Sequence, residues 1–129
     1  MKIKEAEKFL DKGFMKNNNY KVINVSSEYC ELEGTITETS LNPFGIVHGG
    51  YIFGLIDSAA GILINKQDTK FVTISTNIEY IGNTSTGKIT ALAKILKKGK
   101  NVSYAEVEVY DEKKKLIAKA LTNFFNITK

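Results

Sequence analysis

One short segment of the chain gathers residues that could act together on a carbonyl group. The stretch Leu41–Asn65 contains His48, the only histidine of the protein, then Gly49, Gly50 and, further on, Asp57. If a helix begins at the glycine pair, its first N–H groups have no partner inside the helix and carry the positive end of its dipole. Such N–H groups can hold a thioester or ester oxygen as it becomes negative, and a carboxylate can act as a general base. The segment therefore indicates a site for hydrolysis.

Each of these residues also has a plainer interpretation. His48 could be a cap or loop histidine bonded to the backbone, and Asp57 could be a polar residue whose hydrogen bonds are satisfied. Gly54 and Gly61, three residues before and four after Asp57, remove bulk from the helix face that carries the carboxylate. They could equally allow a strand to pack closely. Ser58 belongs to the same stripe of small and polar residues and is a further candidate for substrate contact.

A helix must position these groups. The stretch from about Gly49 to Asn65 is almost purely apolar, which predicts a helix buried on most sides. Asp57 follows Gly49 by eight residues, so at about 1.5 Å rise per residue the two lie roughly 12 Å apart along the axis. One substrate carbon cannot contact both, because a base must come within about 3 Å of the attacking water. We therefore expect a second copy of the chain to supply one half of the site across a two-fold interface.

The remaining residues predict a sheet around this helix. Met1–Leu10 has the spacing of a short amphipathic helix, and the segment Asp11–Asn19 is expected to end this helix at Gly13 and to continue as a polar asparagine run. Patterned stretches bounded by turn residues predict six strands, namely Tyr20–Val25, Glu28–Thr37, Phe71–Tyr80, Lys88–Leu96, Asn101–Tyr110 and Leu116–Thr128. Two strands before a long helix and four after it are typical of an α+β fold in which a curved antiparallel sheet wraps around the helix. At 129 residues, we expect residues 1–129 to form one domain.

The first strand after the helix has an unusual polar face. Strict alternation places Val72, Ile74, Ile78 and Tyr80 on one face and Thr73, Ser75 and Asn77 on the other. A face of this kind is typical of a solvated outer surface. It would instead belong to the site if it lay beside Asp57.

The spacing of the site residues resembles a known family. Asn42, six intervening residues, His48-Gly49-Gly50 and then Asp57 are similar to the signature of hot-dog-fold acyl-CoA thioesterases, in particular the PaaI-like (phenylacetate-pathway thioesterase-related) family. The resemblance extends over nearly the whole chain. It implies a hot-dog fold and hydrolysis of acyl-CoA thioesters to free acid and coenzyme A. It also implies a homodimer as the minimal active unit, which agrees with the distance argument, and we expect a homotetramer built as a dimer of dimers.

The resemblance also assigns roles. Gly49, with Gly50 as a second donor, would bind the carbonyl oxygen, and His48 and Asn42 would orient the thioester or its loop. Asp57 of the partner subunit would activate water or attack the carbonyl itself. Related thioesterases carry a serine or threonine early in the strand after the helix to hold water or substrate. Thr73 falls at this position, and Ser75 is the second choice.

The charge of the chain gives weaker indications. The formal net charge of +4 comes mainly from lysines, and the sequence contains no dense basic helix or nucleotide-binding motif, so no nucleic-acid partner is expected. Lys98 and Lys100 lie on an expected hairpin loop, where lysines commonly keep a sheet edge soluble. Because coenzyme A carries phosphates, the resemblance makes these two lysines candidates for contact with it.

Cofactor chemistry and targeting are not indicated. One histidine and one cysteine, Cys30, leave too few ligands for an ordinary zinc site, so we expect no metal and no cofactor, with coenzyme A as part of the substrate. Cys30 lies on the apolar side of an alternating strand, which favours a core thiol over a nucleophile. No signal peptide or membrane-spanning stretch is evident, so a cytoplasmic protein is expected.

Two other classes of function remain open from the sequence. A hot-dog hydratase or dehydratase would use histidine and acid on a carbon–carbon double bond, but those families are not expected to share this H-G-G and acid spacing. A non-catalytic acyl-CoA-binding module would keep the groove and lose the base, and Asp57 argues against that. A serine hydrolase is disfavoured because Ser58 lies inside the helix and no G-x-S-x-G motif is present.

Overall fold

The computed structural model describes residues 2–65 and 68–128. The chain begins with three short helical segments, α1 (Ile3–Glu7), η1 (Lys8–Leu10) and α2 (Gly13–Asn17). It continues with β1 (Tyr20–Val25), β2 (Tyr29–Thr35), the single turn η2 (Glu38–Ser40) and the long helix α3 (Gly49–Ile64). It ends with β3 (Phe71–Tyr80), β4 (Lys88–Lys97), β5 (Val102–Tyr110) and β6 (Leu116–Asn126).

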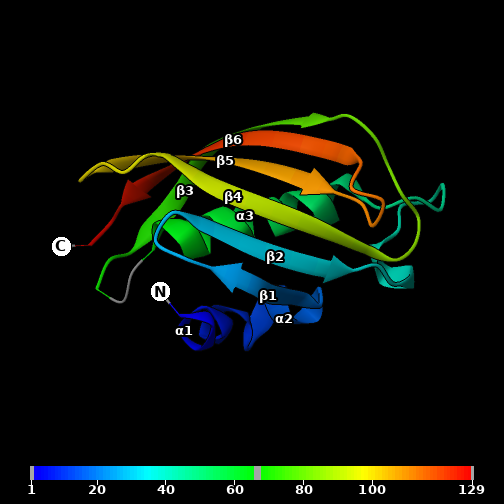
Figure 1. The fold of residues 1–129 in the computed structure, drawn as a ribbon, viewed down its shortest axis with the longest axis horizontal. Coiled ribbons are helices and arrows are strands. Elements are labelled where there is room, and N and C mark those ends of the chain that lie inside the picture. The colour runs from blue at the N-terminus through cyan, green and yellow to red at the C-terminus, as the bar shows by residue number, and fades with distance from the viewer. Residues whose placement is uncertain (1, 66–67, 129) are drawn as a thin grey trace.

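The strands form one sheet around α3. Their order is β1-β2-β4-β5-β6-β3, and every neighbouring pair is antiparallel. Figure 1 shows the sheet curving around α3, with α1 and α2 beside β1. Strands β4, β5 and β6 form a meander, whereas β3 lies beyond β6 at the edge of the sheet. The predicted architecture, a curved antiparallel sheet wrapped around a central helix, is therefore present.

Helix α3 is held by apolar packing against the concave face of the sheet. Leu55 of α3 and Val107 of β5 are fully buried, and burial alternates along the whole of β5 because only one of its faces meets the helix. Phe124 of β6 also faces α3, since its ring lies 3.9 Å from the position that a Cβ on Gly61 would occupy. The helix ends one residue earlier than predicted because Asn65 has extended backbone angles and its side chain donates to the Gly61 carbonyl at 2.9 Å.

The N-terminal segment differs from the prediction. Residues 13–17 form α2, whereas helical structure was expected to end at Gly13, because Phe14 packs on α3 and tertiary contacts outweigh the weak helix propensity of this stretch. A Cβ on Gly54 would lie 2.5 Å from the Tyr20 hydroxyl and 2.7 Å from the Phe14 ring. The same hydroxyl donates to the Tyr51 carbonyl at 2.7 Å. Because Gly54 has no side chain, Phe14 and Tyr20 can pack directly on the surface of α3.

Strand β3 contains a bulge that overturns the predicted strict alternation. Thr73 lies opposite Phe124 and Ser75 lies opposite Asn123, so Ile74 is the extra residue. Thr73 therefore shares the helix-facing side of the sheet with Phe124, whereas Ser75 shares the outer side with Asn123. The sequence placed Thr73 and Ser75 on one face, and that prediction was wrong because a single inserted residue reverses the facing of all later ones.

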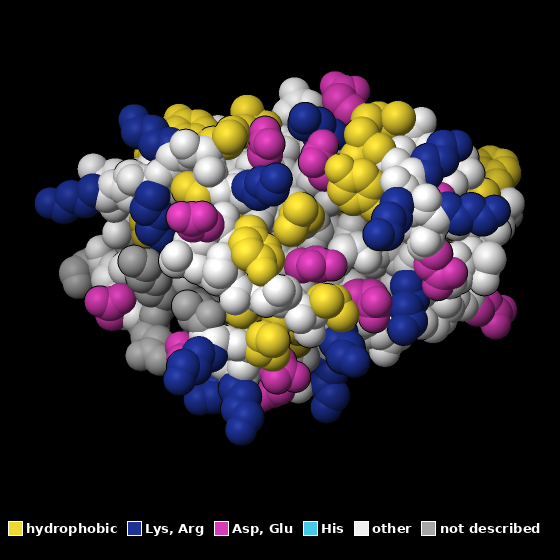
Figure 2. Space-filling model, in the orientation of Figure 1, with side chains coloured by type: hydrophobic (Ala, Val, Ile, Leu, Met, Phe, Trp, Pro, Cys, Tyr) yellow, Lys and Arg dark blue, Asp and Glu magenta, His cyan; other side chains and the backbone are white. Residues whose placement is uncertain are grey.

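The outer surface of the molecule carries charges of both signs. On the face shown in Figure 2, lysines and acidic residues are interspersed with separate hydrophobic patches. Among the residues that the structure describes, no helix is long and apolar enough to cross a membrane. Cys30 is fully buried in the core, as predicted, and burial raises the pKa of its thiol to about 12.

Candidate active site

A tight loop sets the entrance to α3. The Asn42 side-chain oxygen accepts hydrogen bonds from the N–H of Phe44 at 2.9 Å and of Ile46 at 3.2 Å. Gly45 adopts φ of +80° within this turn, a conformation that favours glycine. Asn42 thus organises the loop through its oxygen. Within the described part of the chain, its amide N–H groups have no acceptor, so they remain open to a ligand.

His48 is the N-cap of α3. The His48 Nδ1 accepts a hydrogen bond from the Gly50 N–H at 2.8 Å, and the backbone N–H of His48 donates to the Ser40 carbonyl at 2.8 Å. His48 is therefore a helix cap, as its plainer interpretation predicted. Because the Gly50 N–H is already used, the structure does not offer it as a free donor for a carbonyl oxygen.

Gly49 provides the free donor at this end of the helix. Among residues 2–65 and 68–128, no acceptor is bonded to its N–H, as expected for the first residue of a helix. Its carbonyl accepts a hydrogen bond from the Tyr80 hydroxyl at 2.8 Å. A Cβ on Gly49 would lie 3.3 Å from the Tyr80 ring, so the absence of a side chain lets Tyr80 lie close to the helix end.

Asp57 is held from the neighbouring strand. The Thr73 hydroxyl donates to Asp57 Oδ1 at 2.5 Å, and the bulge at Ile74 is what turns Thr73 toward α3. Asp57 is partly exposed, and its second carboxylate oxygen has no partner among the described residues. The carboxylate is thus oriented and still accessible.

Two other candidate residues lie away from this carboxylate. Ser58 is buried, and its hydroxyl donates to the Gly54 carbonyl at 2.6 Å inside the helix. Ser75 lies on the outer side of the sheet, where its hydroxyl accepts a hydrogen bond from the Asn123 side chain at 2.8 Å. The structure therefore brings Thr73 to Asp57 but brings neither Ser58 nor Ser75 into the same opening.

The two candidate lysines lie near the other end of α3. The Lys98 ammonium group donates to the carbonyl of Ile64, in the last turn of α3, and lies 5.1 Å from the centre of the Phe71 ring. A cation at this position complements the negative end of the helix dipole. Lys100 is exposed on the loop between β4 and β5, and its carbonyl accepts from the Asn126 side chain.

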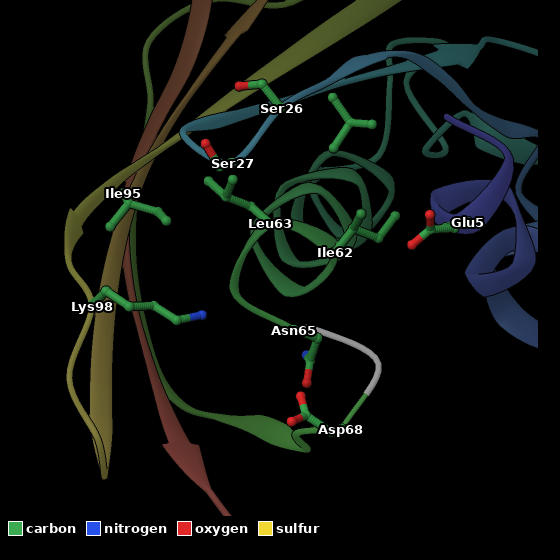
Figure 3. A pocket seen from close by; sticks show the side chains of 10 residues that line it. Glu5, Ser26, Ser27, Ile62, Leu63, Asn65, Asp68, Ile95 and Lys98 are labelled. Atoms are coloured by element: carbon green, nitrogen blue, oxygen red, sulfur yellow. The ribbon is translucent and has the colours of Figure 1, made fainter. Parts of the chain in front are cut away.

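A cavity of about 710 Å³ opens beside Lys98. Figure 3 shows Lys98 and Ile95 on one side, Ile62 and Leu63 of α3 with Asn65 just after it on another, and Glu5 and Asp68 beyond them. Neither Asp57 nor Gly49 lines this cavity. In one copy of the chain, this space is therefore distinct from the groups that could act on a carbonyl.

Tyr80 is the site residue that the sequence did not indicate. It lies at the end of β3, opposite Ala118 of β6, and so on the side of the sheet that faces α3. Strict alternation from Phe71 would place Tyr80 and Thr73 on different faces of the sheet. Without the bulge, nothing in the sequence would bring both side chains to the helix.

The two halves of the proposed site lie on one continuous helix, as predicted from the sequence. Gly49 begins α3 and Asp57 lies eight residues further along it, which corresponds to roughly 12 Å along the helix axis. The free N–H and the carboxylate of one chain therefore cannot contact the same carbonyl group. Within residues 2–65 and 68–128, no three His, Cys, Asp or Glu side chains come together in a way that could hold a metal ion.

The fold and the site define a class of enzyme. The chain belongs to the thioesterase superfamily, whose family model matches residues 44–118, a span that includes the start of α3, Asp57 and Thr73. The chain is therefore an enzyme of the thioesterase class, and the expected hot-dog α+β fold and PaaI-like relationship are confirmed.

Particular relatives extend this result. Acyl-coenzyme A thioesterase PaaI of Escherichia coli is 26% identical over 98 residues, which covers 75% of this chain and 70% of the relative. The protein SSO2140 of Saccharolobus solfataricus is 31% identical over 125 residues, 95% of this chain and 89% of the relative. Among solved structures, the thioesterase HI1161 of Haemophilus influenzae superposes with a TM-score of 0.92 at 16% identity, covering 99% of this chain and 92% of that one. The last comparison concerns the fold alone.

Proposed function

We propose that this protein hydrolyses acyl-CoA thioesters to a free acid and coenzyme A. The observation that carries the proposal is the pair of unsatisfied groups on α3, namely the free N–H of Gly49 and the accessible carboxylate oxygen of Asp57. The first is a donor suited to a developing oxyanion, and the second is an acceptor suited to a water proton. The acyl-CoA substrate class is supported by the name of the PaaI relative.

In the proposed reaction, the thioester carbonyl oxygen lies on the Gly49 N–H of one subunit. Asp57 of the partner subunit takes a proton from water, and the resulting hydroxide attacks the carbonyl carbon. The oxyanion then collapses, the carbon–sulfur bond breaks, and the sulfur leaves with the proton from Asp57 of the partner subunit. In an alternative course, the carboxylate itself attacks and forms an anhydride that water then hydrolyses.

A homodimer would bring the two halves together. Strand β3 pairs with β6 on one side, and within the described residues its other edge has no partner. A long edge strand with exposed apolar side chains is a template for pairing with another chain, and Val72 and Ile74 of β3 are exposed. We propose that β3 of two subunits pair, so that each Asp57, held by Thr73 of the same strand, faces the Gly49 end of its neighbour. The tetramer expected from the resemblance would join two such dimers.

The acyl group would lie against exposed aromatic side chains beside Asp57. Phe53 precedes Asp57 by one helical turn and is partly exposed, and Phe14 lies on Gly54, on the adjacent part of the same turn. Such exposed aromatic surface is typical of a ligand or partner contact. The expected substrate therefore carries an apolar acyl chain or ring.

The direct test measures thiol release from a panel of aromatic, short-chain and medium-chain acyl-CoA esters. Wild type should release free coenzyme A from at least one ester, and Asp57→Ala should lose most of this activity while remaining folded. The buried thiol of Cys30, whose pKa is raised to about 12, should add no background to a thiol reagent. Full turnover by Asp57→Ala would show that the base is assigned wrongly. Binding of esters by wild type without thiol release would identify a binding module instead.

A single-turnover reaction in ¹⁸O-labelled water, with enzyme in excess, tests for the anhydride course: label on Asp57 identifies the anhydride, whereas label in the acid arises both from a general base and from water attack at the acyl carbon of an anhydride. General-base catalysis places the label directly in the released acid. Nucleophilic attack followed by hydrolysis at the carboxylate carbon leaves the released acid unlabelled and places the label on Asp57, where mass spectrometry of the peptide would detect it.

A further inference from the structure

Tyr80 and His48 are joined by a chain of hydrogen bonds at the start of α3. The Tyr80 hydroxyl donates to the Gly49 carbonyl at 2.8 Å. The same peptide unit continues to the Gly50 N–H, which donates to His48 Nδ1 at 2.8 Å. A single peptide group therefore connects the tyrosine hydroxyl to the imidazole.

The direction of these bonds sets the form of the imidazole. Since Nδ1 accepts a hydrogen bond, the proton of a neutral imidazole must be on Nε2. A donor on a carbonyl oxygen polarises the peptide group and strengthens the N–H on its other side as a donor. The Tyr80 hydroxyl thus reinforces the Gly50 bond that holds Nδ1 free of a proton.

We propose that Tyr80 is a positioning residue that fixes His48 as an Nε2–H donor directed out of the helix end, beside the free Gly49 N–H. Because the His48 side chain is exposed, its Nε2–H is available to a ligand. It would be a second donor to the carbonyl oxygen or to a group next to it, in place of the Gly50 N–H that the cap occupies. This role of His48 rests on the proposed thioester hydrolysis, whereas the control of its tautomer by Tyr80 does not.

Tyr80 is suited to this role by its surroundings. Its ring and hydroxyl lie 3.3 to 3.5 Å from the position that a Cβ on Gly49 would occupy, so the ring lies against the helix end although Tyr80 is 51% exposed. Desolvation by the neighbouring protein raises the pKa of Tyr80. The hydroxyl therefore keeps its proton at neutral pH and acts as a donor.

The first test reads the tautomer directly. Since His48 is the only histidine, long-range ¹H–¹⁵N correlation spectra of uniformly labelled protein contain one native imidazole system. At mildly alkaline pH, wild type should show Nε2–H with Nδ1 unprotonated. Tyr80→Phe should shift the signals toward a mixture of both tautomers. A wild-type spectrum with Nδ1–H, or an unchanged tautomer in folded Tyr80→Phe, would overturn the proposal.

The second test measures kinetics. Tyr80→Phe should lower kcat about tenfold with little change in KM, as expected when a group that acts in the transition state loses its alignment. Tyr110→Phe is the matched control, because its hydroxyl bonds to Glu108 at 3.1 Å, remote from α3, and both parameters should stay unchanged. Equal kcat values for Tyr80→Phe and wild type would overturn the catalytic part. If no ester is hydrolysed by wild type, the proposed function fails, while the tautomer spectra still decide the role of Tyr80.

Discussion

The hydroxyl of Thr73 on β3 donates a 2.5 Å hydrogen bond to Asp57 on α3. Seven residues further along the same strand, Tyr80 donates to the Gly49 carbonyl at the start of the same helix. One edge strand therefore bonds to both residues of α3 that carry the proposed functional groups, to the carboxylate of Asp57 and to the carbonyl of Gly49. The other edge of β3 has no partner in the described structure. If two subunits pair along this edge, the pairing fixes the position of the strand that contacts the site.

The Thr73 bond predicts a requirement for a hydroxyl group at this position. Thr73→Val keeps the shape of the side chain and removes the donor, so kcat should fall by about 10- to 100-fold because Asp57 loses its orientation. Thr73→Ser retains the donor and should keep most of the activity. Steady-state kinetics on the best ester of the panel check both variants. Full activity of Thr73→Val would show that the bond has no role in turnover.

The Gly49 N–H can be removed with little disturbance of the helix. Gly49 is the first helical residue, where proline is well tolerated, and His48 before it has φ −64° and ψ 134°, which suits a residue preceding proline. Gly49→Pro should therefore fold and lose about 10²- to 10³-fold in kcat, as for other lost oxyanion donors. Gly49→Ala keeps the N–H while adding a methyl group 3.3 Å from Tyr80, so it controls for bulk. Equal activities of the two variants would exclude the N–H as the donor.

The unpaired edge of β3 predicts the subunit interface. Ile74 is 55% exposed, and Ile74→Lys should place a charge in the interface, dissociate the dimer and abolish activity while preserving the far-ultraviolet circular dichroism spectrum. Leu96, at the end of β4, is also 55% exposed, so Leu96→Lys is a matched control that should remain dimeric. Light scattering after size exclusion measures the mass. An active dimeric Ile74→Lys protein would place the interface elsewhere.

The two glycines in the middle of α3 should respond oppositely to alanine. In Gly54→Ala the new methyl group would meet the Tyr20 hydroxyl and the Phe14 ring, so the free energy of unfolding should fall by about 1–2 kcal/mol. In Gly61→Ala the nearest atom, in Phe124, is 3.9 Å away, and the higher helix propensity of alanine should raise stability by up to about 1 kcal/mol. Urea unfolding at one fixed protein concentration measures both, since dimerisation contributes to stability. A stabilised Gly54→Ala variant would contradict the observed packing.

The sequence was sufficient for the elements whose signals are local. The long apolar run predicted α3 to within one residue at its end, and alternation predicted every strand to within two residues at its ends. Cys30 was correctly assigned to the core. These features depend on hydrophobic periodicity, which can be read directly from the sequence.

The features that were missed depend on contacts between distant parts of the chain. The bulge at Ile74 does not change the pattern of residue types along the strand. The faces of the sheet on which Ser75 and Tyr80 lie therefore could not be predicted from the sequence. Helix α2 forms because Phe14 finds a place on Gly54, which local propensity does not reveal. Lys98 was considered for coenzyme A phosphates because of its charge, but its contact with the end of α3 arises only from the sheet's curvature around the helix.

The shared site is tested most directly by mixing two inactive variants. Gly49→Pro and Asp57→Asn each disable one half of every site in their own homodimers. When they are unfolded together and refolded as a mixture, a heterodimer with sites shared between subunits contains one site with both changes and one intact site. About half of the dimers should be such heterodimers, so activity should recover to about a quarter of the wild-type level. If each site lies within one subunit, every site keeps one of the two changes, and the mixture will stay as inactive as its components.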